Sequence, residues 1–354
     1  MKSAFAAACA ALAAVALRAE PVKIIFDTDM LTDYDDAGAL ACLHALADAG
    51  ECEILETVSC TRGNASVATC EAVNAWYGRP DIPVGCTKEI GFVGHGDQAA
   101  DGNGHAKFRM VRDKYAKWVK HPDSKDAPDA LDVYRKVLAA QPDKSVVICS
   151  VGFLSNMRRL VEADRDLVAR KVKLWVAMAC KYPKGSEYNS MMDWESSKIA
   201  LEKWPTPIVF SDFDYGRWVF AGRRLVESED PRLDGPVRDV FKMTLPPRAQ
   251  CNEKTYDRPE GHPSWDETAV IFAVRGYGDV FGAERGTYRM VGTKGDNEWT
   301  ADPNGPHVRL TEKMPKREVG QLIDGLMCRP PAAPLSAETG GARSRPLQNC
   351  RGMW

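Results

Sequence analysis

The sequence predicts an α/β fold in which a Rossmann-like, mostly parallel central sheet carries helices on both faces. Two observations support this class. Apolar, strand-like runs alternate with helical patterns from residue 22 to residue 210. Polar residues also gather directly after several of these runs, and in such sheets the functional residues lie at the carboxyl ends of the strands.

The elements follow one another in a regular order. VKIIFD is expected to form the first strand, and the helix after it begins near Asp35 and stops at Gly50. EILETVSC then leads through TRGN into the helical stretch ASVATCEAVNAWYG, and KSVVICS leads through VGFLSN into another helix. VKLWVAMAC and TPIVFSD are expected to form two more buried strands.

A chain of 354 residues is long enough for one large α/β domain or two smaller ones. We expect a single domain over residues 20–328. Within it, residues 92–128 are Gly-rich and lack clear periodicity, so we expect a lid or insertion loop over the site. Residues 329–354 are rich in Pro, Gly, Ser and Arg, which predicts a flexible C-terminal tail.

Residues 1–19, MKSAFAAACAALAAVALRA, have the composition of a cleavable export signal: an early lysine, an Ala-rich apolar stretch and a small residue at Ala19. A buried N-terminal helix is the alternative. Cleavage near Ala19 predicts a periplasmic or secreted protein. A net charge of -2 without a long basic run argues against nucleic-acid or anionic-membrane partners. No later apolar run approaches the roughly 18 residues of a membrane span.

Five aspartates fall within ten residues at the end of the first strand, namely Asp27, Asp29, Asp33, Asp35 and Asp36. Carboxylates this close repel one another unless protons or a cation compensate. All of them are oxygen donors without a nearby Cys/His pattern, which favours Ca²⁺ or Mg²⁺ over Zn²⁺. Capping of the next helix would explain only Asp35 and Asp36. We therefore predict a metal site here.

The pattern DTD...DDAGAL resembles the opening motif of the calcium-dependent nucleoside hydrolases of the inosine-uridine preferring type. These enzymes cleave the N-glycosidic bond of ribonucleosides to give ribose and free base. Family members usually have the spacing DxDxxxDD, whereas this chain has two extra residues before the last pair, and Asp33 falls in the insertion. The resemblance makes residues 20–328 the catalytic domain.

Four further segments resemble the family in the correct order: TRGN with Asn64, SVGFLSN with Val151, SEYN with Glu187 and Asn189, and SWDETAV with Asp266. Separated motifs in sequence order are more specific than any single one of them.

The resemblance implies a role for each of these residues. The calcium donors would be the carboxylates of Asp29, Asp36 and Asp266 and the main-chain carbonyl of Val151. The substrate would contact Asp35, Asn64, Glu187, Asn189 and Trp265. Calcium accepts about six to eight oxygens, which leaves room for two ribose hydroxyls and a water. Asp29 would be the catalytic base, and the negative charge would stabilise an oxocarbenium-like transition state.

Trp265 stands where many family members have a histidine that protonates the leaving base. A subset of purine-preferring relatives has tryptophan there and stacks the purine between aromatic rings, so we expect purine nucleosides to be preferred. A simple pocket wall is the alternative role for Trp265. Tyr188 and Trp194 are candidates for the second stacking face or for the core.

Several residues are left with open or structural roles. Asp27 is expected to orient its neighbours or to be purely structural. His95 and His105 lie in the Gly-rich segment as pocket or surface residues, and His44 and His262 are expected to be structural. KYPKG replaces a glycine-rich stretch of the family, so contacts to the ribose 5′ end stay open.

Other kinds of protein are alternatives to this family. A phosphatase-like fold would need Thr or Val soon after Asp-x-Asp, where this chain has Met30 and Leu31. An exported, metal-dependent nucleoside or ribose binder without turnover is the non-enzymatic alternative, and a hydrolase of another ribosyl conjugate is the enzymatic one. Relatives often form dimers or tetramers, so a homodimer or homotetramer is expected.

Overall fold

A computed structural model describes residues 20–31, 33–63, 65–89, 106–251 and 256–333. The predicted export signal, residues 334–354 of the predicted tail, Asn64, His95 and His105 all lie outside the described residues.

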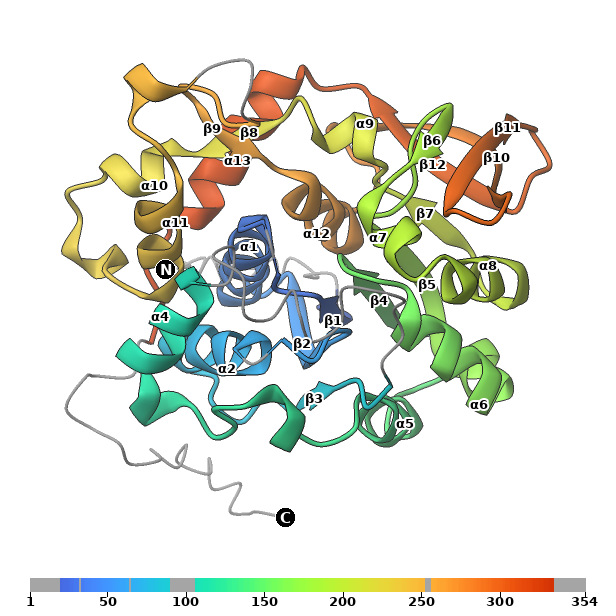
Figure 1. Cartoon of the computed structure of the whole chain (residues 1–354), viewed down its shortest axis with the longest axis horizontal. Helices are drawn as coiled ribbons and strands as arrows, with labels where there is room; N and C mark the ends of the chain where they lie inside the picture. Colours follow the sequence, from blue (N-terminus) through green and yellow to red (C-terminus); the bar gives the residue numbers. More distant parts are fainter. Residues whose placement is uncertain (1–19, 32, 64, 90–105, 252–255, 334–354) are drawn as a thin grey trace, which may run out of the picture.

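Within the described residues, ten strands form one sheet in the order β3-β2-β1-β4-β5-β7-β12-β10-β11-β6 (Figure 1). Their bounds are β1 Val22–Thr28, β2 Cys52–Ser59, β3 Val84–Cys86, β4 Val146–Ser150, β5 Val172–Ala177, β6 Lys184–Ser186, β7 Ile208–Phe210, β10 Phe281–Val291, β11 Asp296–Ala301 and β12 His307–Glu312. The strands from β3 to β12 pair in parallel. This confirms the mostly parallel sheet.

An antiparallel extension of β10, β11 and β6 completes the sheet, and the sequence did not predict it. The reason lies in β10, where buried positions are separated by exposed and half-buried ones. Such a strand contains no continuous apolar run that could stand out in the sequence. A separate two-stranded sheet consists of β8 Phe220–Gly222 and β9 Gly261–Pro263.

Helices cover both faces of the sheet, as predicted. The α-helices are α1 Asp35–Asp48, α2 Ser66–Trp76, α4 Ala106–Lys114, α5 Ala130–Ala139, α6 Ser155–Lys171, α7 Tyr188–Met192, α8 Trp194–Lys203, α9 Phe213–Gly216, α10 Arg223–Glu227, α11 Pro236–Thr244, α12 Trp265–Arg275 and α13 Lys316–Met327. Short 3-10 turns are η2 Ala116–Trp118, η3 Ser124–Asp126, η4 Pro231–Leu233 and η5 Arg248–Gln250. Among the described helices, none is both long and apolar enough to cross a membrane.

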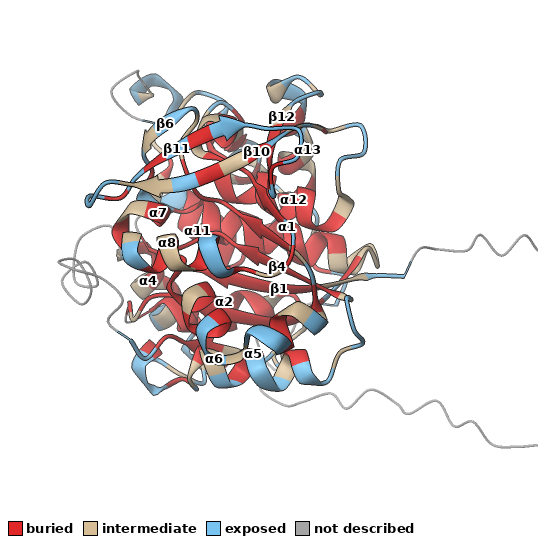
Figure 2. Ribbon diagram, turned by 90° about the vertical axis from the view of Figure 1, so that its right-hand side faces the viewer, coloured by how far each residue is buried: buried red, intermediate tan, exposed pale blue. Residues whose placement is uncertain are grey.

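Successive residues of the central strands supply two separate cores because strand side chains alternate between faces. Ile24 and Phe26 pack in the core beneath α1, α2, α12 and α13, whereas Ile25 belongs to the core beneath α5, α6 and α8. Figure 2 shows the buried strands between these layers, with the exposed positions of α5 and α6 facing outwards. The sheet is thus buried on both sides.

The strand order reverses between β1 and β4, since β1 leads outwards to β2 and β3 whereas β4 leads to β5 and β7. In open parallel sheets, the crevice at such a switch point is where ligands bind. Asp29 follows β1 and Val151 follows β4, so both segments reach this crevice.

Within residues 92–128, the described part begins at Ala106 and contains helical structure that we did not expect. Helix α4 begins at Ala106 and packs on α2 and α11, and two 3-10 turns follow it. The described part of the segment is therefore structured, because Phe108, Val111 and Trp118 bury apolar side chains that the Gly-rich composition concealed. Its role as a lid stays a prediction.

Gly152, directly after Val151, permits the close approach of the β1 and β4 ends. A Cβ there would lie 2.5 Å from the backbone nitrogen of Asp29 and 2.6 Å from the Sγ of Cys60. We expect Gly152→Ala to lower the free energy of unfolding by about 1–3 kcal/mol, because the backbone must shift. The measurement is chemical denaturation. Gly325→Ala is the control, since nothing lies within 4 Å of that Cβ in α13, and an equal loss in both variants would contradict the close-approach argument.

Candidate active site

Four aspartates from three segments meet at the switch point. Asp29 follows the carboxyl end of β1, Asp35 and Asp36 form the first turn of α1, and Asp266 lies in the first turn of α12. Helices α1 and α12 pack against each other, so both N-termini reach the same place. The positive ends of the two helix dipoles favour carboxylates there.

The carboxylates are close enough to share one ion. Asp35, Asp36 and Asp266 each offer an oxygen, and these oxygens all lie within 4.8 Å of one another. The backbone nitrogen of Asp266 donates to Oδ2 of Asp35 at 3.2 Å, which ties α12 to α1. Asp29 is joined to Asp36 by a side-chain hydrogen bond. All four side chains are buried.

Burial without a compensating cation raises the pKa of every member of this cluster. Burial, then the charge of Asp36, raises the pKa of Asp29 well above its usual range. Burial raises the pKa of Asp35 to about 8. Burial and the charge of Asp35 hold the pKa of Asp266 far above normal. Without metal, the cluster therefore keeps protons that ordinary aspartates lose.

Two neighbours fix Asp36 in its position. The hydroxyl of Thr28 donates to Oδ1 of Asp36, and the backbone nitrogen of Met30 donates to the same oxygen at 3.2 Å. Met30 has a φ of 46°, in the left-handed region that non-glycine residues rarely occupy. Strained backbone of this kind persists where the surrounding structure holds it. Here it lies in the turn that leads from β1 to Asp35 and Asp36.

The residue after β4, Val151, contributes a backbone oxygen to the site, and the SEYN segment at the start of α7 packs against it. The carbonyl of Val151 accepts a hydrogen bond from Nδ2 of Asn189 at 3.0 Å, and the same amide donates to the carbonyl of Met178 at 3.1 Å. Glu187 caps α7, accepting from the backbone nitrogens of Asn189 and Ser190 at 2.7 and 2.9 Å. A carbonyl oxygen has two lone pairs, so Val151 can still offer one to a ligand.

A cavity of about 290 Å³ opens onto these groups. It is lined by Asp29, Asp33, Asp35, Asp36, Val151, Met178, Glu187, Tyr188, Asn189, Phe213, Tyr256, Trp265 and Asp266. The structure thus brings together every described residue that the sequence placed in the site. Asn64 lies outside the described residues, so its part stays a prediction.

Aromatic rings form one wall of the cavity. Trp265 donates from Nε1 to the carbonyl of Phe213 at 3.0 Å and stacks on the Phe213 ring, with centroids 5.4 Å apart. Tyr256 meets Trp265 edge-on at 5.4 Å. Tyr188 lines the cavity as well, whereas Trp194 is not among its lining residues. Neither Phe213 nor Tyr256 lies in a motif, and the one sequence signal for Phe213 is its position directly after the predicted strand TPIVFSD.

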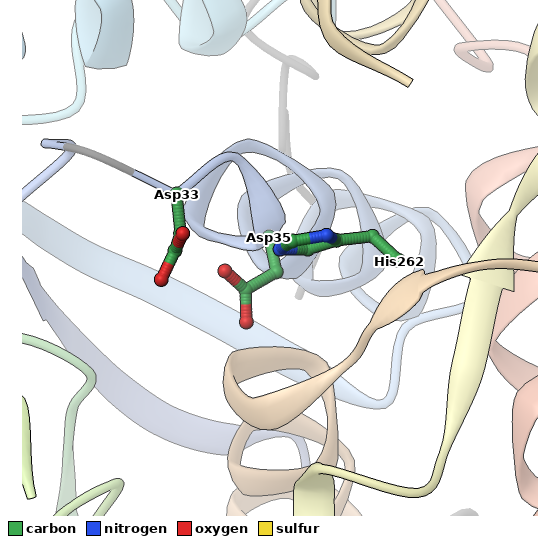
Figure 3. Close-up of side chains that lie close together, drawn as sticks. All are labelled: Asp33, Asp35 and His262. Carbon is green, nitrogen blue, oxygen red and sulfur yellow. The ribbon is translucent and has the colours of Figure 1, made fainter. Parts of the chain in front are cut away.

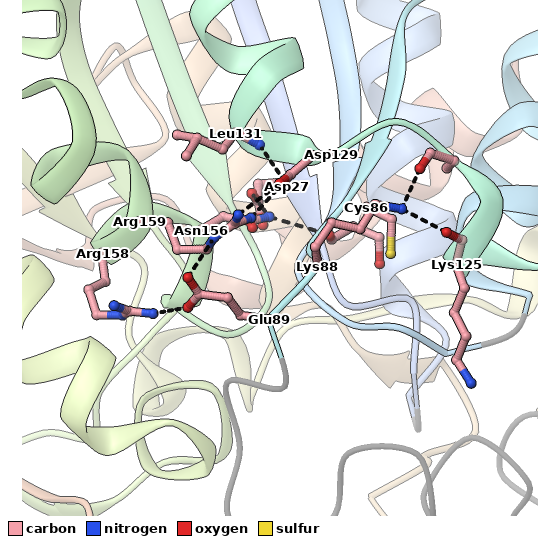
Figure 4. A network of polar contacts seen from close by, with 12 residues as sticks. Asp27, Cys86, Lys88, Glu89, Lys125, Asp129, Leu131, Asn156, Arg158 and Arg159 are labelled. Carbon is pink, nitrogen blue, oxygen red and sulfur yellow. Dashed lines mark hydrogen bonds and ion pairs between the residues drawn. The ribbon is translucent and has the colours of Figure 1, made fainter.

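Asp27 lies behind the site and does not line the cavity. It accepts hydrogen bonds from the hydroxyl of Tyr134 at 2.8 Å and from Nδ2 of Asn156 at 2.9 Å. Figure 4 shows Asn156 reaching Asp27 while Arg159, on the same helix α6, reaches Asp129. Burial raises the pKa of Asp27 to about 7. Asp27 thus joins β1 to α5 and α6, in agreement with an orienting or structural role.

His262, which we expected to be structural, faces the acidic cluster instead. Figure 3 shows the tip of its ring pointing towards Asp35, with Asp33 beside it. No sequence motif indicates this position, because β9 brings His262 to the cluster only in the fold. His44 is structural, as expected: it is fully buried, bonds to Asn74 at 2.9 Å and stacks on Tyr77.

Lys107 of α4 is a second basic residue that the sequence did not place near the site. Its side chain is buried, and burial lowers its pKa to about 8, although the charges of Asp33 and Asp36 oppose this shift. The helix at the end of the Gly-rich segment therefore lies within the electrostatic reach of the aspartates.

The donor set fits a divalent cation. Convergent carboxylates, buried and with raised pKa values, gain most from an ion that replaces their protons. The fold and the cluster therefore define a metal-dependent enzyme whose pocket, with acidic groups on one side and aromatic rings on the other, lies at the switch point of a parallel sheet.

Comparison with known families agrees with this class. Residues 24–322 match the family model for the inosine-uridine preferring nucleoside hydrolases, so the chain belongs to that family. Its members are N-glycosyl hydrolases that depend on a metal and act on ribonucleosides. A search of curated proteins finds no match.

Several solved structures share the fold. An inosine-uridine preferring nucleoside hydrolase from Bacillus anthracis has a TM-score of 0.65 and 14% identity, covering 86% of this chain and 99% of that one. A purine-preferring ribonucleoside hydrolase from Gardnerella vaginalis has a TM-score of 0.65 and 16% identity, with coverage of 86% and 99%. A plant nucleoside hydrolase has a TM-score of 0.65 and 17% identity, with coverage of 88% and 100%.

The raised pKa of Asp35 predicts how stability changes with pH. Asp35 titrates near 3.8 when unfolded but at about 8 in the fold, so between these values the folded protein holds a proton that the unfolded chain lacks. Stability of the metal-free protein should therefore fall as pH rises through this window, by up to about 1.4 kcal/mol per pH unit for one proton. The measurement is the melting temperature with and without a saturating divalent cation.

The cation should remove most of this decline, and Asp35→Asn should flatten it. Asp166→Asn, on the exposed side of α6, is the control that keeps it. A melting temperature that rises with pH in the metal-free protein would show that the cluster does not retain protons.

Proposed function

We propose that this chain is a calcium-dependent ribonucleoside hydrolase that prefers purine nucleosides and is exported. The observation that carries the metal assignment is the convergence of Asp266 with Asp35 and Asp36, because residues 230 positions apart in sequence offer oxygens within 4.8 Å of one another. Family membership gives the reaction class.

The chemistry of the donors favours a hard cation over Zn²⁺, and calcium is the hard cation that the family resemblance implies. Asp29, Asp36, Asp266 and the carbonyl of Val151 are all oxygen ligands, and they leave open positions on an ion that accepts about six to eight. When bound, the ion would supply a Lewis acid that activates water and orients the ribose hydroxyls. The same residues line the cavity, so an ion held by them would be accessible to substrate there.

The protein groups would share the remaining tasks. Asp29 is proposed as the general base, since its carboxylate lines the cavity at the end of β1. Asp35 would accept hydrogen bonds from the ribose hydroxyls, held in place by the backbone nitrogen of Asp266. Glu187 and Asn189 would border the sugar, with Asn64 as a further contact. The carboxylates would also stabilise positive charge that develops on the ribose ring.

Glu187 and Asn189 also have a structural role within the protein. Their hydrogen bonds to backbone groups set the position of α7 and of the Val151 carbonyl. They are therefore proposed to border the sugar as rigid, pre-oriented groups, which lowers the entropy lost on binding.

Purine preference is proposed from the aromatic wall. Trp265 is held by Phe213 beneath it and Tyr256 at its edge, so its ring is pre-oriented for a planar base. A purine offers a larger stacking face than a pyrimidine. One structural neighbour, an effector protein, was solved with adenosine diphosphate ribose, and another ribosyl conjugate is the second substrate class to test.

Export rests on residues 1–19 alone, and cleavage near Ala19 would leave the described domain intact because its first strand begins at Val22. Assembly into a homodimer or homotetramer remains the expectation.

Release of ribose tests the function. The calcium-loaded protein should release ribose from inosine and adenosine, and Asp266→Asn should lose both turnover and calcium binding, because one carboxylate is removed from the shared site. Calcium affinity is measured by calorimetry and ribose by a reducing-sugar assay. Asp166→Asn is the matched exposed control. Tight nucleoside binding without ribose release would instead identify a binding protein, and unchanged calcium affinity in Asp266→Asn would refute the site.

Trp265→Ala tests the base preference. Loss of the stacking ring should cost about 0.5–1.5 kcal/mol with a purine, which lowers kcat/KM for inosine by about 2- to 13-fold. The loss for uridine should be smaller. Trp194→Ala, which changes a tryptophan that does not line the cavity, is the control. An equal loss for both nucleosides would remove the stacking argument.

A further inference from the structure

A second group of metal-ligating side chains lies beside the acidic cluster. Asp33, Asp35 and His262 each offer one ligand atom, and the three atoms lie within 4.8 Å of one another. Figure 3 shows the two carboxyl groups and the imidazole ring converging from the loop before α1, from α1 and from β9. This group differs from the first because it includes a nitrogen.

The two ring nitrogens of His262 have the environments that are typical of a metal-binding histidine. Its Nδ1 bonds to Oδ1 of Asp257 at 2.8 Å, while Nε2 is buried and has no hydrogen-bond partner among the described residues. His262 is only 5% exposed. A histidine that gives one nitrogen to a carboxylate and aims the other at further ligands has the arrangement common at metal centres, where the carboxylate fixes the ring.

The ring is held in position on several sides. Tyr34 stacks on it with centroids 4.0 Å apart, and the hydroxyl of Tyr34 donates to Asp257 at 2.6 Å. Trp265 meets the ring edge-on at 5.7 Å. Asp257 therefore restrains both the histidine and the tyrosine beneath it, so little reorganisation is needed for a ligand to bind Nε2.

Asp33, the third member of the group, lies in the loop before α1. It lies in the two-residue insertion that separates this chain from the usual family spacing, and it is exposed at the rim of the cavity. Asp35 belongs to both groups. Its carboxylate has two oxygens, so it can offer one to an ion of this second group and keep the other for hydrogen bonds.

We propose that Asp33, Asp35 and His262 form a second metal site, for a borderline divalent ion such as Zn²⁺ or Co²⁺. One imidazole nitrogen and two carboxylates suit such ions better than Ca²⁺, which prefers oxygen alone. Three protein ligands leave a position open to solvent on the Asp33 side, which provides an entry path. The inference does not depend on the proposed hydrolase activity, because the site is detected by metal binding alone.

A protonated His262 is the competing account. Burial opposes the charged form, but the hydrogen bond to Asp257 and the charges of Asp35 and Asp33 outweigh burial and raise the pKa of His262. A proton and a metal ion would compete for the same nitrogen, so a direct measurement of metal binding separates the two accounts.

The experiment titrates Co²⁺ into the metal-stripped full-length protein after saturation with Ca²⁺. Bound Co²⁺ is counted by equilibrium dialysis, and its visible absorption reports nitrogen and oxygen ligation. We expect one Co²⁺ per chain in addition to retained Ca²⁺. Asp33→Asn and His262→Gln should each weaken Co²⁺ binding by at least about 10-fold, and Asp257→Asn by about 10- to 100-fold.

The controls separate loss of the site from loss of the fold. Asp33 is exposed, so Asp33→Asn should fold even if His262→Gln does not, and calcium affinity should persist in both folded variants. His121→Gln, which changes a histidine paired with Glu71 on α2, should bind Co²⁺ normally. No Co²⁺ uptake at saturating Ca²⁺, displacement of Ca²⁺ one for one, or normal uptake by Asp33→Asn would each overturn the proposal.

Discussion

Mutual repulsion among Asp29, Asp35, Asp36 and Asp266 is the constraint on which the rest of the site depends. Four buried carboxylates cannot all be charged unless something opposes their field. The fold supplies part of the answer by aiming the N-termini of α1 and α12 at them. Protons supply the remainder in the metal-free protein, which is why the pKa values rise. A cation would replace these protons, so metal binding, pH and stability are coupled through one cluster.

The scaffold keeps these groups together through close packing at two glycines, Gly38 and Gly152. α12 lies so near α1 that a Cβ on Gly38 would come 2.2 Å from Oε1 of Glu267. On the other side, Gly152 lets the segment after β4 touch the backbone of Asp29. Asp35, Asp36 and Asp266 are fixed by helices that pack in one core, and Asp29 directly follows the buried strand β1. Rigid support of this kind is what a site needs if its geometry is to be set before the ligand arrives.

The cavity has an acidic side and an aromatic side. Its acidic side is suited to a cation and a sugar diol, whereas Trp265, Phe213 and Tyr256 form an apolar side suited to a planar base. His262 lies between them, in contact with Trp265 and facing Asp35. Any change at His262 would therefore reach both the aromatic wall and the acidic cluster.

The sequence by itself determined the parallel sheet, the strand ends and the family, because continuous apolar runs and ordered motifs are local signals. It also placed Asp29, Asp35, Asp36, Glu187, Asn189, Trp265 and Asp266 in one site. Only the tertiary structure decided which residues outside the motifs lie at the site. Phe213 and Tyr256 line the cavity, and His262 lies beside Trp265 and Asp35, all through packing between segments distant in the sequence. The antiparallel edge and α4 were missed for a related reason, since half-exposed elements leave no continuous apolar run. Contacts between segments distant in sequence are set by how helices and sheets pack, and no local pattern records them.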